Sequence, residues 1–321
     1  MRQSYIREAG QGISFLGRWY RKKKVKSILK NWELYLLLLP VAAYFIIFCY
    51  IPMYGIQIAF KDFMPLKGLW GSPWLGFDHF VKFFSSYYFR SLIENTLGIS
   101  LYSLAVGFPA PIILALMMNE AKNKYFRRTV QTITYAPYFI STVVLVGMIV
   151  TFLSPQTGVV NKLMQLLGGE SIYFMGESQW FKTIYVFSGV WQGTGWGSII
   201  YMAALTGIDP QLHEAAIIDG AGKLRRIWHI NIPGILPTVT IMFILAAGSV
   251  MSVGFEKVFL MQNDLNRVAS DVISTFVYRN GILGAEFSFS TAVGLFNSVV
   301  NFILLITVNT MSHKLSETSL W

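Results

Sequence analysis

The chain has 321 residues, of which 54% are hydrophobic and only 13% are charged, and its mean hydropathy is +0.51. Soluble domains carry about 25% charged residues, so this composition excludes an ordinary soluble protein and indicates a membrane protein. The formal net charge of +10 raises the alternative of nucleic-acid binding. The distribution of that charge, described below, argues against nucleic acid and indicates a membrane orientation.

Residues 1–30 form a basic arm with interleaved apolar side chains, and its densest run of charge is Arg21-Lys22-Lys23-Lys24. Two interpretations of this arm stay open. It either forms an interfacial helix on the anionic inner leaflet of a membrane, or it is a topology-setting segment with little fixed structure. The apolar run that follows is far longer than the ~7–15 residues of a signal-peptide core, so it is not a cleaved signal.

Six uncharged apolar runs are each long enough to cross a hydrocarbon core of ~30 Å, which needs ~20 residues of helix. We expect transmembrane helices at about 34–60, 95–119, 129–153, 183–208, 235–255 and 287–312. Residues 31–313 therefore form one all-α membrane domain, followed by a tail at 314–321. None of the six runs contains Asp, Glu, Lys, Arg or His. Ion-driven carriers place ionisable residues inside the membrane, so uphill transport here must draw its energy from outside the spans.

Lysine and arginine are concentrated on one side of this arrangement. With the N-terminus in the cytoplasm, the basic arm, the 119–128 loop, the 207–234 loop and the tail hold 17 basic and 7 acidic residues. The three opposite loops hold 9 of each. This is the positive-inside distribution, and it predicts that both termini are cytoplasmic.

The segment from His213 to Pro237 is charged, and glycines and prolines interrupt it, between two apolar runs. It fails the metalloprotease motif H-E-x-x-H, because Ile217 stands where the second histidine is required. It fails the phosphate-binding motif G-x-x-x-x-G-K-[ST], because Leu224 stands where a hydroxyl residue is required. The sequence shows no paired carboxylates, metal cluster or nucleophile–base set that would support a membrane-embedded enzyme.

The local signals in this segment predict two short helices. Asp209 is a good N-cap and Pro210 suits the first helical position, so a helix is expected over 211–219. Gly220 and Gly222 are expected to end it, because glycine enters the left-handed backbone region at little cost.

A second short helix is expected over 223–230, with Pro233 and Pro237 ending it and restarting the chain at the membrane. The product is a compact helix–turn–helix on the cytoplasmic side, in which Ala215 and Ala216 allow close approach. Such a unit suits docking into a cleft of another protein. The alternative is an ordinary amphipathic loop that lies on the lipid.

The spacing of this segment resembles a known loop. The EAA loop of bacterial ABC importer membrane subunits reads E-A-A-x₃-G-x₉-I-x-L-P, and the chain matches it with Glu214-Ala215-Ala216, Gly220, Ile230, Ile232 and Pro233, where Ile232 replaces leucine. Asp219-Gly220-Ala221 is similar to the form in sugar-importer permeases. The stretches NTLGISLYSLAVGFPAPIILALMMNE, TITYAPYFIST, DVISTFVYRNGI and FSFSTAVGLFNSVVNFILL resemble the polysaccharide and oligosaccharide branch, over roughly residues 70–312.

The resemblance implies the fold of a type I ABC importer permease, with six transmembrane helices and a cytoplasmic coupling helix in the loop 209–233. In that family this helix sits in a groove of a cytoplasmic ATPase dimer. The residues that it places in the docking region are Glu214, Ala215, Ala216, Asp219, Gly220, Arg225, Arg226, Ile232 and Pro233. The two arginines are expected to pair with acidic residues of the ATPase or with lipid phosphate.

The resemblance also implies that the chain is a transport subunit rather than an enzyme, with no catalytic, cofactor or metal site of its own. ATP and Mg²⁺ then belong to the partner ATPase. The other implied partners are a homologous second permease, an extracellular solute-binding protein and the lipid bilayer. The implied location is the bacterial plasma membrane.

The leading hypothesis for function is import of an oligosaccharide or polysaccharide fragment. A permease for peptides or another solute is the alternative within the ABC class. An ion-coupled secondary carrier is the alternative outside it, and the charge-free spans argue against that mechanism.

A sugar presents hydroxyl groups and C–H faces, so aromatic rings and amides suit a path for it. For a neutral sugar we expect no strong point charge there. The candidates from spans three to five are Tyr135, Tyr138, Trp191, Gln192, Trp196, Tyr201 and Glu256. Tyr138, Trp191 and Gln192 are preferred, because Pro137 is expected to open one helix and the glycine-rich stretch 193–197 leaves a gap in another. Helix packing, or a place at the membrane interface, is the competing interpretation for every aromatic residue.

Overall fold

The computed structural model describes residues 31–316 and 319–320. The basic arm at 1–30 and part of the tail at 314–321 lie outside the described residues. Within these ranges the regular secondary structure is helical, as expected, apart from an isolated bridge between Lys61 and Trp74. It divides into two units, Met1–Gln57 and Ile58–Trp321.

The described part of the first unit is one apolar helix. It consists of α2 (Trp32–Phe45), the π-helical turn η1 (Ile46–Tyr50) and α3 (Ile51–Met53), and the 3₁₀ helix η2 (Tyr54–Phe60) then leads into the second unit. Pro40 lies inside α2. Leu37 is 74% exposed and Phe48 is 64% exposed, which suits contact with lipid acyl chains.

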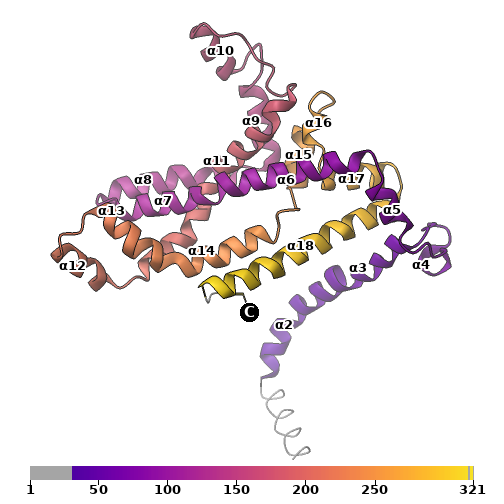
Figure 1. The fold of residues 1–321 in the computed structure, drawn as a ribbon, viewed down its shortest axis with the longest axis horizontal. Helices are drawn as coiled ribbons and strands as arrows, with labels where there is room; N and C mark the ends of the chain where they lie inside the picture. Colours follow the sequence, from indigo (N-terminus) through magenta and orange to yellow (C-terminus); the bar gives the residue numbers. More distant parts are fainter. Residues whose placement is uncertain (1–30, 317–318, 321) are drawn as a thin grey trace, which may run out of the picture. The chain divides into compact units, whose positions relative to one another are not determined.

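The second unit holds the remaining helices, which Figure 1 shows as a ribbon. Its first half comprises α4 (Gly68–Gly71), α5 (Asp78–Phe84), α6 (Tyr88–Gly107), α7 (Pro109–Glu120), α8 (Lys124–Tyr135), η3 (Ala136–Phe139), α9 (Thr142–Phe152) and α10 (Val159–Leu166). Its second half comprises α11 (Ser178–Thr206), α12 (Pro210–Ile218), α13 (Lys223–Arg226), η4 (Ile227–Asn231), α14 (Ile232–Ala247), α15 (Phe255–Met261), α16 (Arg267–Ser270), α17 (Ile273–Tyr278), η5 (Arg279–Leu283) and α18 (Phe287–Ser316).

Four helices are long and apolar enough to cross a membrane, at Trp32–Phe60, Tyr88–Glu120, Lys223–Ala247 and Phe287–Lys314. The expected span 129–153 is instead a pair of helices, α8–η3 and α9, bent by 101° at a short break. The expected span 183–208 corresponds to α11, which has 29 residues. Helix α11 is not among the four helices above, because its glycine, threonine and glutamine residues lower its mean hydropathy. The expected span 235–255 ends earlier than predicted, because α14 stops at Ala247.

Helix α11 lies at the centre of the second unit, where it packs against α6, α7, α8 and α14, and α14 in turn packs against α18. The core falls into three clusters of buried apolar side chains. One joins α6, α9, α11 and α15, with Phe181 and Val258 among its members. A second joins α5, α6, α17 and α18 around Phe83. The third joins α7, α11 and α14 and includes Tyr201.

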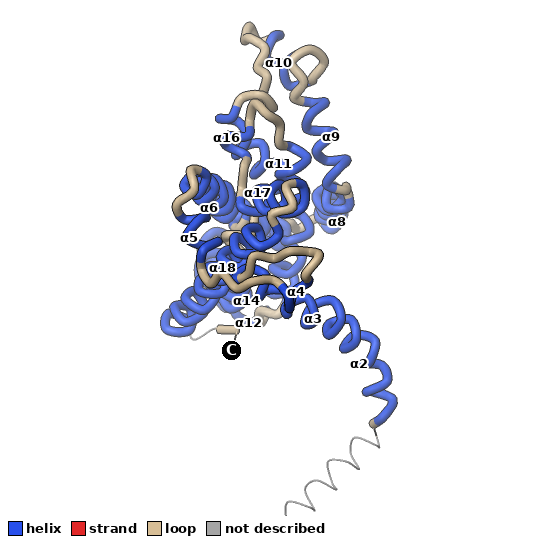
Figure 2. The backbone as a smooth tube through the Cα atoms, turned by 90° about the vertical axis from the view of Figure 1, so that its right-hand side faces the viewer, coloured by secondary structure: helices blue, strands red, loops and turns tan. Residues whose placement is uncertain are grey.

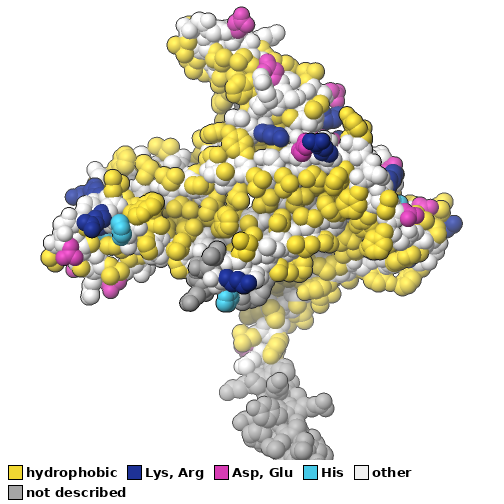
Figure 3. Space-filling view, viewed as in Figure 1, with side chains coloured by type: hydrophobic (Ala, Val, Ile, Leu, Met, Phe, Trp, Pro, Cys, Tyr) yellow, Lys and Arg dark blue, Asp and Glu magenta, His cyan; other side chains and the backbone are white. Residues whose placement is uncertain are grey.

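Helices α9 and α10 project from this helical body, and both views show α10 at the tip of the projection. A broad apolar surface covers much of α14 and α18, and charged side chains lie around it, at the ends of the unit and along its upper edge (Figure 3). On α18, Phe302 is 62% exposed and Ile303 is 55% exposed. A continuous apolar face of this kind is what a lipid bilayer requires of an integral membrane protein.

One backbone contact sets how closely α11 approaches α8. A β-carbon added at Gly195 would lie 1.9 Å from the carbonyl oxygen of Thr134 and 2.3 Å from its carbonyl carbon. Only a glycine leaves room for this approach, as in the small-residue interfaces of membrane helices. At Gly193, two residues away on the same helix, an added β-carbon would meet nothing within 4 Å. Gly195 therefore serves close packing, whereas Gly193 borders open space.

We expect Gly195→Ala to lower the free energy of unfolding by about 1–3 kcal/mol or more, because overpacking a core usually costs this much. Gly193→Ala is the matched control, because it makes the same change in helix propensity without a clash and should be neutral or stabilising by up to about 1 kcal/mol. Thermal unfolding in detergent compares the two variants. Equal unfolding temperatures for both would contradict the close contact.

Candidate functional site

The segment expected to dock begins as the sequence predicts. The side chain of Asp209 accepts a hydrogen bond from the backbone N–H of Gln211 at 2.9 Å, and Pro210 is the first residue of α12. Helix α12 ends at Ile218, and Gly220 follows with φ of +75°. This is the left-handed conformation that only glycine adopts cheaply. Gly222 does not share the role, because its φ is −71°.

The prediction that the second short helix ends before Pro233 is wrong. Helix α13 continues through the π-helical turn η4 into α14, so that Lys223–Ala247 forms one apolar helix of 25 residues. Pro233 occupies the first turn of α14, and Pro237 lies inside it. The π-turn changes the hydrogen-bond pattern just before Pro233, and proline fits a first turn because its missing N–H is not needed there. The prolines therefore do not restart the chain.

Helix α12 and the start of α13 form an exposed surface at one end of the second unit (Figure 1). Glu214, Ala215, Asp219 and Gly220 are exposed, and Ala216 is half-buried. Large apolar side chains surround them, since Leu212, Ile217, Ile218, Leu224 and Trp228 are each at least 54% exposed. We call the exposed side chains of residues 212–228 the α12 surface. Its mixture of apolar and charged groups suits a protein partner.

Three further residues expected to dock, Ile232, Pro233 and Arg225, lie in different environments. Ile232 packs against the cluster that joins α7, α11 and α14, so it belongs to the core rather than to the α12 surface. Pro233 is exposed at the start of α14. Arg225 is exposed on α13, as a docking residue should be.

Arg226 faces its own chain. Its Nη2 lies 3.9 Å from Oε2 of Glu120 at the end of α7, and the two side chains are only 16% and 19% exposed. The expectation that Arg226 pairs with a partner subunit or with lipid is therefore revised. Arg226 instead ties the start of α13 to α7.

Of the residues expected along the sugar path, three meet at the bend between α8 and α9. The ring of Tyr138 stacks on that of Trp196 with centroids 4.6 Å apart and planes within 6°. Nε2 of Gln192 donates to the carbonyl oxygen of Ile140 at 2.8 Å. This carbonyl lies at the break that follows Pro137, so Gln192 satisfies a backbone group that the broken helix leaves free.

The other expected path residues lie elsewhere. Trp191 borders an apolar cavity with Leu145 and Phe152. Tyr201 is only 3% exposed and belongs to the core. Tyr135 is half-buried on α8. Glu256 is exposed on the separate helix α15 and not at the end of α14.

Two adjacent polar cavities lie beside this bend and share Ser103, Gly107 and Tyr185. The first has a volume of about 370 Å³ and is lined by α6, α11, α14 and the segment 249–254. The second has a volume of about 400 Å³ and includes Gln192 and Lys257 in its lining. Each is large enough for a sugar unit, and each lining combines hydroxyl groups with apolar side chains.

Sequence reasoning proposed Gln192 from these linings but missed most of the other lining residues, among them Ser103, Tyr185 and Lys257. A signal for the first was present, because Ser100, Ser103 and Gly107 follow helical spacing and place small residues on one face of α6. Tyr185 could not be singled out, because its sequence context is like that of the other aromatic residues in the predicted spans. Lys257 lies beyond the predicted end of span five.

The ammonium group of Lys257 is held at the edge of the second cavity. Nζ donates to the carbonyl oxygen of Tyr185 at 2.8 Å and lies 4.6 Å from the centroid of the Tyr185 ring. Helix α15, which carries Lys257, is outside the apolar spans. Burial lowers the pKa of Lys257 to about 8, because a low-dielectric environment disfavours the charged form. The side chain is therefore still largely protonated at neutral pH.

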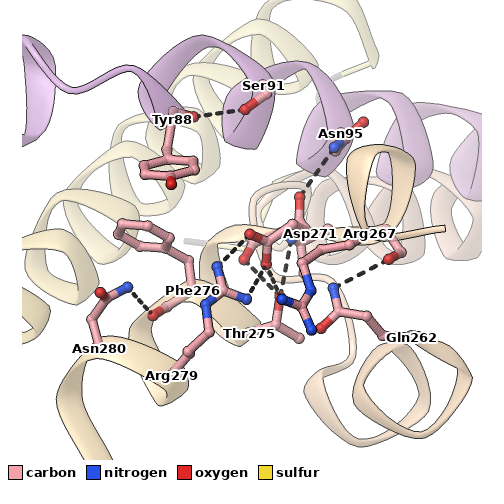
Figure 4. Close-up of polar contacts among 12 residues, drawn as sticks. Tyr88, Ser91, Asn95, Gln262, Arg267, Asp271, Thr275, Phe276, Arg279 and Asn280 are labelled. Atoms are coloured by element: carbon pink, nitrogen blue, oxygen red, sulfur yellow. Dashed lines mark hydrogen bonds and ion pairs between the residues drawn. The ribbon is translucent and has the colours of Figure 1, made fainter. Parts of the chain in front are cut away.

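A second polar cluster fixes the helices that follow α14 onto α6 (Figure 4). Arg279 donates to both carboxylate oxygens of Asp271, and Nη2 lies 2.5 Å from Oδ2. Thr275 donates to the same carboxylate at 2.9 Å. Nδ2 of Asn95 on α6 donates to the carbonyl oxygens of Val268 and Asp271. These bonds hold the segment that carries α15 to α17, and thus Lys257, in place.

The described residues contain no cluster of side chains that would form a metal site. No group of three or more His, Cys, Asp or Glu side chains there is close enough to hold a metal ion. His213 and Glu214 lie on α12, where Glu214 is exposed. The long apolar helices, the polar cavities and the α12 surface together suit an integral membrane permease.

Comparison with known proteins agrees with this class. Residues 107–316 match the family described as "Binding-protein-dependent transport system inner membrane component". The chain is 44% identical to protein LplB of Bacillus subtilis (strain 168), over 100% of this chain and 98% of that protein. It is 40% identical to the polygalacturonan/rhamnogalacturonan transport system permease protein YteP of the same organism, over 94% of each chain.

A solved structure is also similar. The chain matches a bacterial ABC transporter involved in the import of the acidic polysaccharide alginate, with a TM-score of 0.85 and 44% identity. The match covers 91% of this chain and 98% of that one. The chain therefore belongs to the binding-protein-dependent transport system inner membrane component family. It is the permease subunit of an ABC importer, and the resemblance to the polysaccharide and oligosaccharide branch is confirmed.

We expect Arg226→Gln to destabilise the chain by about 1–3 kcal/mol, because it leaves the mostly buried carboxylate of Glu120 without its cation. Arg225→Gln is the matched control, since it removes the same charge from an exposed neighbour. Thermal unfolding of the purified permease measures both. If Arg225→Gln lowered the unfolding temperature as much as Arg226→Gln, the pairing with Glu120 would not be the cause.

Proposed function

We propose that the solute moved through this permease is an acidic oligosaccharide, a fragment of a polyuronate. The observation that carries this proposal is the 44% identity, across nearly the whole length of both chains, to a subunit of the alginate importer. The 40% identity to a polygalacturonan/rhamnogalacturonan permease supports it independently. A peptide solute and an ion-coupled mechanism have no comparable support.

An external solute-binding protein delivers the oligosaccharide in this proposal. The family description, which makes transport dependent on a binding protein, supports that step. The sugar then passes the two polar cavities beside the bend. Hydroxyl and amide groups of Ser103 and Gln192 suit its hydroxyl groups, and the stacked pair Tyr138 and Trp196 offers an aromatic face.

The energy comes from ATP on a separate ATPase dimer, which binds ATP and Mg²⁺ and docks on the α12 surface. This surface supports the role because it exposes large apolar side chains, such as Ile218 at 85%, around the charged groups of Glu214 and Asp219. The fixed turn at Gly220 supports it too, because a rigid short helix can transmit a movement of the ATPase.

A second, homologous permease completes the path. The two polar cavities support this partner, because both open at the surface of the single chain and need another wall to separate the sugar from lipid. Both termini lie in the cytoplasm in this proposal. The excess of 17 basic over 7 acidic residues on the predicted inner side supports that orientation.

We expect Gly220→Val to lower solute-stimulated ATP hydrolysis by the complete importer about tenfold, because a β-branched residue at positive φ costs about 1–2 kcal/mol and disturbs the end of α12. Gly222→Val is the matched control. Its backbone is extended, with φ of −71° and ψ of 169°, and an added β-carbon meets nothing within 4 Å.

ATPase activity is measured in proteoliposomes with and without the loaded binding protein, after equal insertion of both variants has been verified. Coupling is lost if Gly220→Val keeps basal hydrolysis and loses stimulation. Full stimulation in Gly220→Val would contradict the docking role of the α12 surface.

A further inference from the structure

The ammonium group of Lys257 is enclosed by α11 on one side. It donates to the carbonyl oxygen of Tyr185 at 2.8 Å, and it lies so close to Gly189 that a β-carbon there would be 3.3 Å from Nζ. Gly189 therefore leaves room for the lysine side chain at the wall of the second cavity, which both residues line. The ammonium group therefore occupies the space at the cavity wall that the absence of a side chain at Gly189 leaves open.

This cation has no anionic partner in the described part of the chain. None of the ion pairs found within residues 31–316 involves Lys257. The neighbouring Glu256 is exposed and forms no pair with it. A half-buried charge without a counter-charge is costly to desolvate, so such a group is usually retained for a ligand or a partner.

The cavity beside Lys257 is built for a polar ligand. Its volume is about 400 Å³, and its lining includes Ser103, Gln192 and Thr194. The Nε2 donor of Gln192 is used by Ile140, which leaves its oxygen to accept from a hydroxyl group. An ammonium group beside hydroxyl-binding groups matches the two chemical features of a uronate, its carboxylate and its hydroxyls.

We propose that Lys257 binds the carboxylate of a uronate unit as the oligosaccharide passes the second cavity, and that it thereby selects acidic over uncharged sugars. This inference rests on the proposed function. It replaces the expectation of a charge-free path with a single positive charge at one wall of the path.

A single lysine suits transport better than a rigid ion-pair network. Lysine is a compact point charge on a flexible stem, and it holds a carboxylate without the bidentate geometry of arginine. One of its donors stays bound to the backbone at Tyr185. The contact therefore attracts each carboxylate without trapping it, as binding sites along a conduction path must.

The test uses the complete importer, purified with its native partner subunits and reconstituted in proteoliposomes. Uptake of an oligogalacturonate is compared with uptake of the same oligosaccharide after methyl esterification, which removes the charge and keeps the sugar backbone. The variants are Lys257→Gln and Lys257→Arg. Lys182→Gln is the matched control, because Lys182 is also a half-buried lysine that lies against a glycine, Gly98, but lines neither polar cavity.

We expect Lys257→Gln to lower uptake of the oligogalacturonate about tenfold or more, as loss of a charge-assisted hydrogen bond does. Lys257→Arg keeps the charge but binds the carboxylate in a different geometry, so it should lower uptake less than Lys257→Gln does, and Lys182→Gln should resemble the wild type. A second readout restores the charge chemically. The chain's single cysteine, Cys49, is first replaced by serine so that a label reacts only at position 257 of this chain. In this background, Lys257→Cys should regain uptake with an aminoethyl thiosulfonate label and not with a hydroxyethyl label.

Three results overturn the inference. They are full oligogalacturonate uptake by Lys257→Gln, equal losses in the Gln and Arg variants, and equal uptake with the two thiol labels. Failure of the proposed function looks different, because the wild-type importer would then take up no oligogalacturonate at all.

Discussion

The close approach of α11 to α8 is the constraint on which the rest of the site depends. It requires Gly195, because the carbonyl group of Thr134 occupies the space of any side chain there. The approach places Gln192 against the free carbonyl of Ile140 and Trp196 against Tyr138. The bend between α8 and α9 is thereby fixed, and with it the wall that α11 presents to the polar cavities.

The cavities depend on the same helix, at positions nearer its N-terminus. Tyr185 and Gly189, on earlier turns of α11, receive the side chain of Lys257 from α15. The polar cluster of Asp271, Arg279 and Asn95 holds the segment that carries α15 against α6. The two polar cavities therefore lie between elements that are far apart in the sequence. The outer faces of α14 and α18 remain apolar, as lipid requires.

The features that sequence reasoning predicted correctly are local ones. The N-cap at Asp209 and the left-handed turn at Gly220 depend on residues only a few positions apart, so their signals can be read directly from the sequence. The membership in the importer family followed from the same short segment. The break near Pro137 was predicted for a similar reason, because proline removes a backbone donor.

The errors concern long-range contacts and helix faces. The continuation of α13 into α14 depends on a π-turn that has no clear sequence signal. The pairing of Arg226 with Glu120 joins residues in different helices. Spacing alone did not tell which side of α11 faces the path, so Tyr201 was proposed for the path although it is buried in the core. Lys257 was overlooked because it lies outside the predicted spans.

The central claim is that this permease moves an acidic oligosaccharide with energy from ATP. The most direct test is uptake of labelled oligogalacturonate into proteoliposomes that contain the complete importer, with ATP or an imposed ion gradient as the only energy source. The account predicts uptake that requires both enclosed ATP and the external binding protein, and no uptake with the gradient alone. Accumulation driven by the gradient without ATP would contradict it.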